Sequence, residues 1–131
     1  MSWILDTNVC IVILKGAEPG ILERLRARDP SDYVLSTIVR AELLFGAEKS
    51  ARAPENLALL DRFFARFESL PFDDEAARHY GRIRAALEGA ARTIGANDLL
   101  IAAQALAGDH VLVTRNRREF SRVPGLRWES W

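Results

Sequence analysis

Three short apolar runs, each leading directly into polar residues, constrain the fold of this chain more than any other feature. They are Ile4–Leu5, the segment YVLS at 33–36 and the segment HVLVT at 110–114. All three have the length and composition of short buried strands. Helical patterns fill the sequence between them. Strands that alternate with helices predict a parallel sheet with helices packed on both faces.

The segments between these runs carry apolar residues at helical spacing and are bounded by glycine, proline and capping residues. We expect six helices: over 7–14, starting at Pro19, over 38–49, starting at Pro54, starting after Asp73 or Asp74, and over 98–107. We also expect a short extended piece at 69–72 and an edge strand in the closing GLRWESW. No repeat, low-complexity tract or linker interrupts this order, and 131 residues suffice for one core. The sequence therefore predicts a single α/β domain over residues 1–131.

Positive and negative side chains balance in this chain, with 18 of each, so the formal net charge is zero. That balance gives no whole-molecule attraction to nucleic acid. Five arginines nevertheless lie close together late in the sequence, and arginine suits bidentate contacts to phosphate. They are Arg115, Arg117, Arg118, Arg122 and Arg127. A solvated surface is the alternative interpretation.

The chain has one cysteine, Cys10, which excludes an internal disulfide. Its apolar neighbours are typical of a small core residue. The sequence shows no leader pattern at its start and no apolar stretch long enough to span a membrane. We therefore expect a cytoplasmic protein.

Asp6 directly follows the first predicted strand. In parallel sheets, ligands bind at the carboxyl ends of the strands, so this carboxylate lies where sites are built. An aspartate at the start of a helix is also a common N-cap. The position alone favours neither interpretation.

Glu42 and Asp98 are the other acids that need an explanation. Glu42 shares a helix face with apolar residues, where an unpaired carboxylate is costly; the alternative is a rim position that reaches solvent. Asp98 opens the most apolar helix, where Asn97 can serve as the cap. Its alternative role is a favourable interaction with the helix dipole.

The loop after the strand HVLVT faces the same edge of the sheet as Asp6. Asn116 offers an uncharged oxygen there, and Glu119 offers a carboxylate one turn further on. A surface charge paired with a neighbouring arginine is the alternative role for Glu119.

If Asp6, Glu42 and Asp98 converge, their mutual repulsion requires a cation or a proton. Two charges ~5 Å apart at an effective dielectric of ~20 repel by roughly 3 kcal/mol. Carboxylate and amide oxygens suit Mg²⁺ or Mn²⁺ rather than Zn²⁺. A carboxylate-held Mg²⁺ beside arginines is suited to phosphodiester chemistry.

These residues, in this order, resemble the PIN-domain nucleases, specifically the VapC toxins of bacterial VapBC toxin–antitoxin modules. The stretches that carry the resemblance are LDTN (5–8), AELLFGAEKS (41–50), IRAALE (83–88), IGANDLLIAAQAL (94–106) and LVTRNRREFSRVPGL (112–126). The resemblance implies a three-layer α/β/α domain whose mainly parallel sheet has four or five strands. It also implies a metal-dependent endoribonuclease with Asp6, Glu42 and Asp98 at the family's acidic metal-binding positions.

One position departs from the family pattern. Many PIN domains carry a fourth acid, an aspartate, where this chain has Asn116. Either Asn116 orients a metal-bound water or Glu119 supplies the missing charge. The resemblance further implies supporting hydrogen bonds from Thr7, Asn8 and Thr114.

The segment TRNRREF resembles a subgroup that cuts the anticodon stem-loop of initiator tRNA. This implies an RNA substrate, with phosphate contacts from Arg115, Arg117 and Arg118.

The resemblance also implies a protein partner. VapC toxins are inhibited by a VapB-type antitoxin, commonly form homodimers within a larger toxin–antitoxin assembly, and reach promoter DNA only through the antitoxin. The helix near 55–67 has more apolar residues than one core-facing stripe needs, and we expect the antitoxin to bind at Leu57, Leu60 and Phe64. Burial of this helix within the domain is the alternative.

Three other functions share parts of this pattern. A phosphoacceptor receiver domain needs an acidic pair after the first strand and a late lysine, but this chain has Asp6 alone and only Lys15 and Lys49. The three acids argue against a PIN-like binding module without catalysis, while Asn116 leaves that function open. A PIN nuclease of RNA processing, outside any toxin system, is the third alternative.

Overall fold

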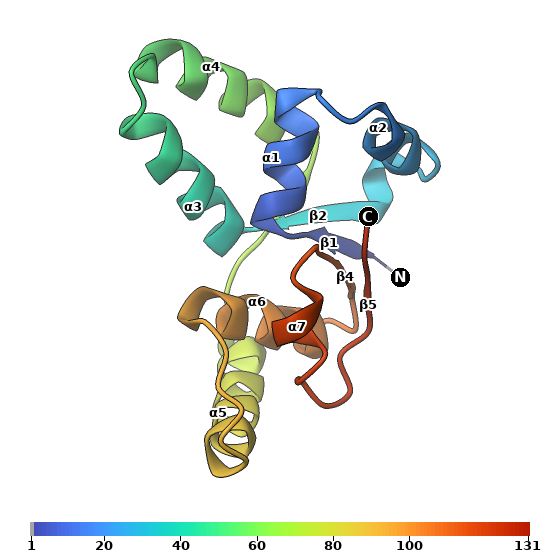
Figure 1. Ribbon diagram of the computed structural model, residues 1–131, viewed down its shortest axis with the longest axis vertical. Helices are drawn as coiled ribbons and strands as arrows, with labels where there is room; N and C mark the ends of the chain where they lie inside the picture. Colours follow the sequence, from blue (N-terminus) through green and yellow to red (C-terminus); the bar gives the residue numbers. More distant parts are fainter. Residues whose placement is uncertain (1) are drawn as a thin grey trace.

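The computed structural model describes residues 2–131 and shows three layers, with a central sheet between two sets of helices (Figure 1). The sheet has five strands in the order β3-β2-β1-β4-β5, and every neighbouring pair is parallel. The strands are β1 (Trp3–Leu5), β2 (Tyr33–Ser36), β3 (Glu68–Leu70), β4 (Val111–Val113) and β5 (Trp128–Glu129). The predicted α/β/α architecture with a parallel sheet is confirmed.

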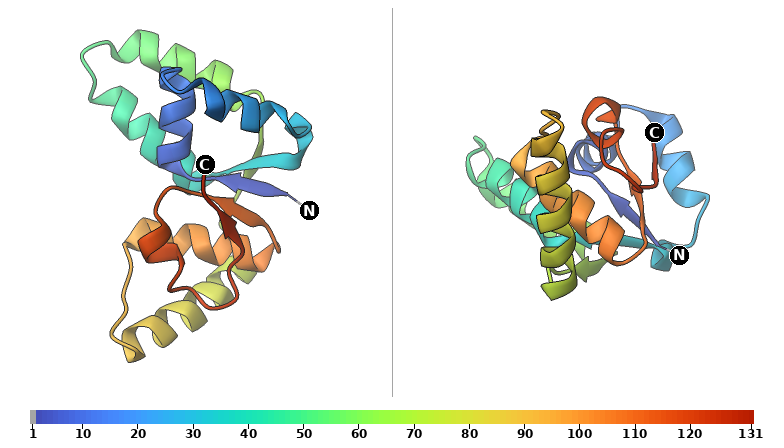
Figure 2. Two further views of the ribbon diagram at one scale, coloured as in Figure 1. Left: turned by 45° about the vertical axis from the view of Figure 1, so that its right-hand side comes forward. Right: turned by 90° about the horizontal axis from the view of Figure 1, so that it is seen from below.

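The helices divide between the two faces in chain order. One face carries α1 (Thr7–Lys15), α2 (Pro19–Arg26), α3 (Thr37–Glu48) and α4 (Ala53–Phe64). The other carries α5 (Asp74–Gly89), α6 (Ala96–Ala107) and the short α7 (Arg117–Phe120), and a 3₁₀ turn at Pro30–Asp32 precedes β2. α5 and α6 pack side by side, as both views in Figure 2 show.

Local chemistry explains where the helices begin and end. Ser36 caps α3, its hydroxyl accepting from the Ile38 N–H at 3.0 Å, and Asp73 caps α5 by accepting from the Ala76 N–H at 2.9 Å. Gly16 ends α1 with a φ of 64°, a left-handed conformation that suits glycine. Asp73, rather than Asp74, is therefore the cap of α5.

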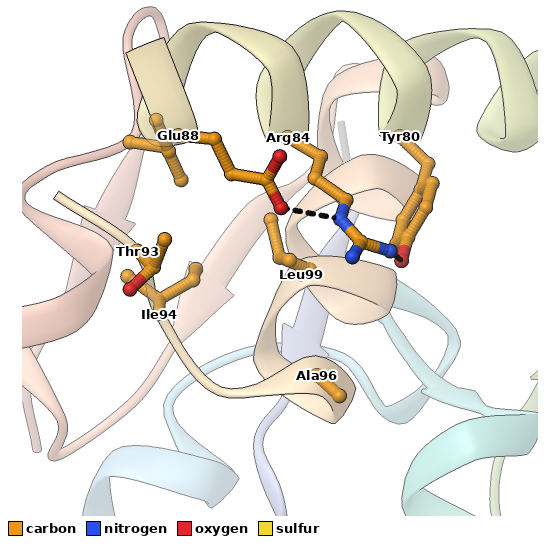
Figure 3. Close-up of a pocket in the computed structure, with 8 residues that line it drawn as sticks. Tyr80, Arg84, Glu88, Thr93, Ile94, Ala96 and Leu99 are labelled. Carbon is orange, nitrogen blue, oxygen red and sulfur yellow. Dashed lines mark hydrogen bonds and ion pairs between the residues drawn. The ribbon is translucent and has the colours of Figure 1, made fainter. Parts of the chain in front are cut away.

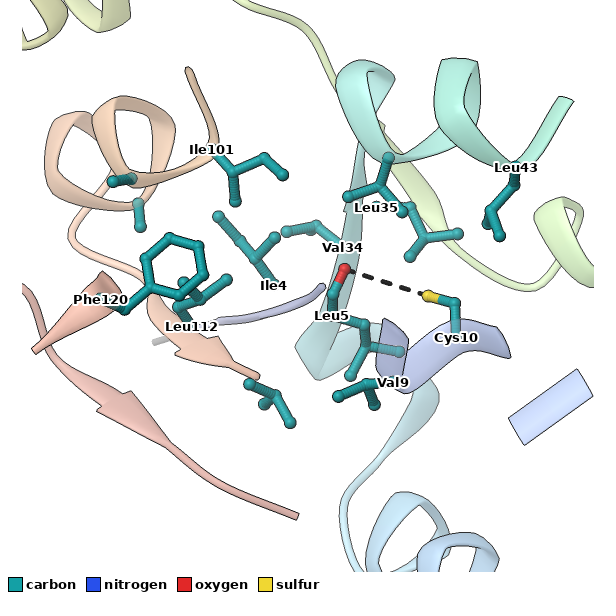
Figure 4. Packing of buried hydrophobic residues seen from close by; sticks show 14 of the residues in the cluster. Ile4, Leu5, Val9, Cys10, Val34, Leu35, Leu43, Ile101, Leu112 and Phe120 are labelled. Atoms are coloured by element: carbon teal, nitrogen blue, oxygen red, sulfur yellow. Dashed lines mark hydrogen bonds between the residues drawn. The ribbon is translucent and has the colours of Figure 1, made fainter. Parts of the chain in front are cut away.

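The core lies around the central strands and α6. Ile4, Leu5, Leu112 and Phe120 are fully buried, and Ile101 on α6 packs into the same cluster (Figure 4). Burial of α6 on nearly all sides was predicted from its apolar sequence and is confirmed.

A polar link crosses this core from α6. Gln104 donates from Nε2 to the carbonyl of Leu70 at 3.1 Å, and its Oε1 accepts from the Ser36 hydroxyl at 2.5 Å. Both polar ends of this buried amide are therefore satisfied, and α6 is tied to β2 and β3.

The structure differs from the expected elements in two places. α6 begins at Ala96 with Gly95 at the N-cap position, so Asn97 lies within the first turn and is not the cap. The four-residue α7 was not predicted, because so short a helix has no readable periodicity.

No helix among residues 2–131 has the length and hydropathy needed to cross a membrane.

Candidate active site

The site is built where β1 and β4 end side by side. Leu5 pairs with Val113, and the Asp6 N–H donates to the Val113 carbonyl at 2.9 Å, so Asp6 and Thr114 emerge next to each other. Both side chains are buried. The Thr114 hydroxyl donates to Asp6 Oδ2 at 2.7 Å.

Asp6 is the N-cap of α1 and also accepts a second hydrogen bond. Its Oδ1 accepts from the Thr7 N–H at 2.8 Å and so caps α1, while Oδ2 takes the bond from Thr114. Only 4% of the residue is exposed. Burial raises the pKa of Asp6, and the bonds from Thr114 and Thr7 lower it only in part.

Glu42 joins Asp6 through Thr7. The Thr7 hydroxyl donates to Glu42 Oε1 at 2.9 Å, which links the first turn of α1 to α3. The negative charge of Glu42 also contributes to the raised pKa of Asp6. The predicted convergence of these two acids is therefore present in the structure.

Asp98 lies in the first turn of α6 and pairs with Glu119 of α7. Burial, then a hydrogen bond shared with Glu119, then the charge of Asp6 raise the pKa of Asp98 to about 8. The bond from Asp98 is also the main cause that lowers the pKa of Glu119. The two carboxyl groups therefore titrate together, with the pKa of Asp98 raised and the pKa of Glu119 lowered.

Asn116 holds this second pair of acids together. Its Nδ2 donates to Asp98 Oδ2 at 3.0 Å and to Glu119 Oε2 at 2.9 Å. Its own N–H donates to the Thr114 hydroxyl at 2.9 Å, and Thr114 in turn donates to Asp6. A chain of hydrogen bonds through Thr7 and Thr114 thus connects the five predicted catalytic residues. These residues are Asp6, Glu42, Asp98, Asn116 and Glu119.

Gly95 is a site residue that sequence reasoning missed. Its N–H donates to Glu119 Oε1 at 3.2 Å, and a Cβ added to it would lie 3.7 Å from Asp98 Oδ2. The motif IGAND contains it, but nothing in the local pattern indicates a contact with a residue 24 positions away.

The predicted supporting and RNA-binding residues lie in different environments. Asn8 is exposed on α1, and Arg117 and Arg118 are exposed on α7. Arg115 instead forms a bidentate ion pair with Glu18 near the start of α2, with Nη1 3.1 Å from Oε1. Glu18 was not foreseen, because 97 residues separate it from Arg115.

The predicted antitoxin-binding residues are unequally accessible. Leu60 is buried in the core, while Leu57 and Phe64 are partly buried against it. The large apolar side chains that α3 and α4 expose are instead Phe45, at 66%, and Leu59, at 42%.

The donor set has the chemistry of a hard-cation site. It offers carboxylate oxygens and one amide, and burial raises the pKa of both Asp6 and Asp98. A divalent cation would reverse that effect, because it favours the charged carboxylates. As the side chains lie, however, no three acidic, histidine or cysteine residues within 2–131 surround a single point closely enough to hold an ion. The oxygen ligands suit Mg²⁺ or Mn²⁺. The structure arranges the acids as two hydrogen-bonded pairs and not around one ion position; the pairs are Asp6 with Glu42 and Asp98 with Glu119.

Comparison with known proteins decides the family. The PIN domain model matches residues 3–126. The chain belongs to the VapC family of PIN-domain proteins. It is 41% identical to the tRNA(fMet)-specific endonuclease VapC of Salmonella typhimurium over 131 residues, covering all of this chain and 98% of that protein. It is 38% identical to ribonuclease VapC2 of Haemophilus influenzae, with the same coverage.

Solved structures agree with this assignment. The DNA-bound VapBC complex of Salmonella typhimurium matches with a TM-score of 0.95 and 41% identity, covering 100% of this chain and 98% of the matched chain. VapBC2 of Rickettsia felis, bound to a DNA fragment from its promoter, matches with a TM-score of 0.91 and 37% identity, covering 100% and 99%. The PIN fold predicted for this chain is therefore confirmed.

Proposed function

We propose that this protein is a metal-dependent endoribonuclease that acts as the toxin of a toxin–antitoxin pair. The observation that carries the proposal is the hydrogen-bonded network of Asp6, Glu42, Asp98 and Glu119 at the carboxyl end of the sheet. Relatives named as ribonucleases, over the full length of the chain, support RNA as the substrate.

Asp6, Glu42 and Asp98 are the residues that would hold the cation, with Glu119 as the fourth carboxylate in place of the family's aspartate. When bound, Mg²⁺ or Mn²⁺ polarises the scissile phosphate and lowers the pKa of a bound water. Asn116 fixes the positions of Asp98 and Glu119. Thr114 and Thr7 hold the Asp6 carboxylate in place, and outer hydrogen bonds of this kind orient metal ligands.

Arg117 and Arg118, exposed on α7 beside Asn116, supply positive charge for the RNA backbone. Initiator tRNA is the substrate we propose, on the strength of the relative named for tRNA(fMet). A cytoplasmic location is part of this proposal, because initiator tRNA is found there.

The partner in this proposal is a VapB-type antitoxin. The structural relatives are VapBC complexes, some bound to DNA, which supports a toxin–antitoxin assembly that includes a toxin homodimer and contacts promoter DNA through the antitoxin. A groove of about 340 Å³ between α1, α3 and α4 offers the docking surface. Ile11, Leu14, Leu59 and Leu60 line it, and Glu42 lies at its wall. A segment bound in this groove would contact Glu42, one of the acids of the network, and could block the site from there.

The test is cleavage of tRNA by the purified protein with Mg²⁺, with Mn²⁺ and with EDTA. We expect discrete products with either cation and none with EDTA. Asp6→Ala and Asp98→Asn lose cleavage, whereas Asp74→Asn, an exposed aspartate on α5, retains it. Cleavage that persists in EDTA or in both site variants contradicts the proposal.

A further inference from the structure

A second cavity lies between α5 and the start of α6 and has a volume of about 250 Å³ (Figure 3). Its lining includes Tyr80, Arg84 and Glu88 from α5, and Ile94, Ala96 and Leu99 from the far side. Ligand pockets for whole small molecules measure ~300–1,000 Å³, so this cavity suits a smaller group. None of the residues assigned to the acid network lines it.

The cavity and the acid network share one short segment of chain. Ile94 and Ala96 line the cavity, while Gly95 between them donates to Glu119 and approaches Asp98. Leu99, the residue after Asp98 in the first turn of α6, forms part of the cavity wall. The cavity and the acid network are therefore in contact with the same short segment of chain.

The walls combine three kinds of chemistry. Tyr80 presents an aromatic ring, fixed by an edge contact with Phe72 at 6.4 Å between centroids. Arg84 presents a guanidinium plane 6.0 Å from that ring, held by donation to Tyr80 Oη and to Glu88 Oε1, each at 3.0 Å. Buried Ile94 and Leu99 supply an apolar floor.

A ring, a guanidinium plane and a carboxylate are the groups with which proteins hold an unstacked nucleobase. Bases stack on aromatic rings and on arginine planes, and their edges form hydrogen bonds to polar side chains. The Glu88 carboxylate only accepts hydrogen bonds. It therefore favours a base with adjacent N–H donors, and guanine presents N1–H and N2–H₂ side by side.

We propose that this cavity holds a guanine base of the RNA substrate, beside the phosphodiester that the acid network cleaves. The inference rests on the proposed ribonuclease function and adds a residue set that selects the cleavage site. Tyr80 and Arg84 provide the stacking faces, and Glu88 reads the edge of the base. The cavity is a recess beside the acids rather than an extended apolar face, which favours a single base over a protein segment.

The experiment compares three cavity variants with two controls on the same helix. Tyr80→Leu, Arg84→Ala and Glu88→Gln alter the cavity, while Arg78→Ala and Glu75→Gln alter an exposed ion pair of α5 that does not line it. The substrates are short RNAs that carry each of the four bases next to the cut. Loss of stacking corresponds to a roughly 5- to 150-fold fall in kcat/KM for Tyr80→Leu and Arg84→Ala. Glu88→Gln is expected to lose the preference for guanine, and both controls match the wild type.

Binding is measured separately by fluorescence anisotropy of labelled RNA on Asp98→Asn, with and without the cavity substitutions, so that affinity is read without cleavage. If the wild type cleaves RNA but the cavity variants behave like the controls in both assays, the cavity inference is wrong and the ribonuclease function stands. If the wild type cleaves no RNA, both fail. If light scattering shows that the cavity variants change oligomeric state and not base preference, the surface is a protein contact and the inference is overturned.

Discussion

Replacing Thr114 by valine tests the hydrogen-bond chain at its centre. Valine has nearly the shape of threonine, so the change removes the hydroxyl without opening a cavity. The hydroxyl donates to Asp6 Oδ2 at 2.7 Å and accepts from the Asn116 N–H at 2.9 Å, and the residue is fully buried. Thr114→Val therefore removes one partner from a buried carboxylate and one from a backbone amide.

The expected cost follows from these two losses. A hydrogen bond to a charged group contributes ~1.5–3 kcal/mol, and a buried donor without a partner costs ~1–3 kcal/mol. Asn116 is only partly buried, so water relieves some of the second loss. We expect the free energy of unfolding to fall by about 2–4 kcal/mol, a large share of the ~5–15 kcal/mol typical of a domain.

The assay is urea denaturation at several pH values, with Thr114→Ser as the control. Serine keeps the hydroxyl and loses one methyl group, at a cost of about 1 kcal/mol. Because the Thr114 bond lowers the pKa of Asp6, its loss raises that pKa further, and the penalty of valine grows as pH rises and Asp6 ionises. If valine costs no more than serine at neutral pH, the chain of hydrogen bonds does not have the role assigned to it.

Three further predictions concern other parts of the site and the core. Because the pKa of Asp98 is raised, the folded protein binds a proton at this residue more tightly than the unfolded chain does. Without a cation, the free energy of unfolding should therefore fall as the pH rises from about 4 to about 8. Denaturation curves for Asp98→Asn should show a smaller fall over the same range than those of the wild type. Asn116→Asp removes the donor shared by Asp98 and Glu119 and adds a negative charge. Without a cation this should lower the free energy of unfolding by about 1–3 kcal/mol, and Mg²⁺ should restore stability. Thermal melts with Mg²⁺ and with EDTA measure both effects, and an equal loss of stability in the two conditions would count against a cation site. Phe120→Ala empties a fully buried position under the site and should cost about 3–5 kcal/mol, whereas exposed Arg118→Ala should stay within ~0.5 kcal/mol in the same denaturation assay.

Much of the fold could be predicted because its signals are local. The runs that became β1, β2 and β4 are short, apolar and separated by helical patterns, and the rule for parallel sheets then places Asp6 at the binding edge. α6 was predicted from its apolar sequence alone.

The details of the site could not be predicted because they depend on side-chain geometry between distant segments. Asn116 lies 18 residues from Asp98, and the short α7 that brings Glu119 into contact has too few residues for a periodic signal. The sequence offers Asn97 as a cap of α6, since asparagine is a favoured cap, but Gly95 occupies that position. Its N–H bond to Glu119 is a tertiary contact that no local pattern shows.

Direct cation binding tests the central claim that the acids of three separate elements form one site. Mn²⁺ titration of the purified protein, followed by electron paramagnetic resonance, measures it without any RNA. We expect saturable Mn²⁺ binding to the wild type and to Asp74→Asn, and greatly weakened binding to Asp6→Asn, Glu42→Gln and Asp98→Asn. A wild type that binds no Mn²⁺, or three site variants that bind it as tightly as the wild type, would contradict a shared cation site.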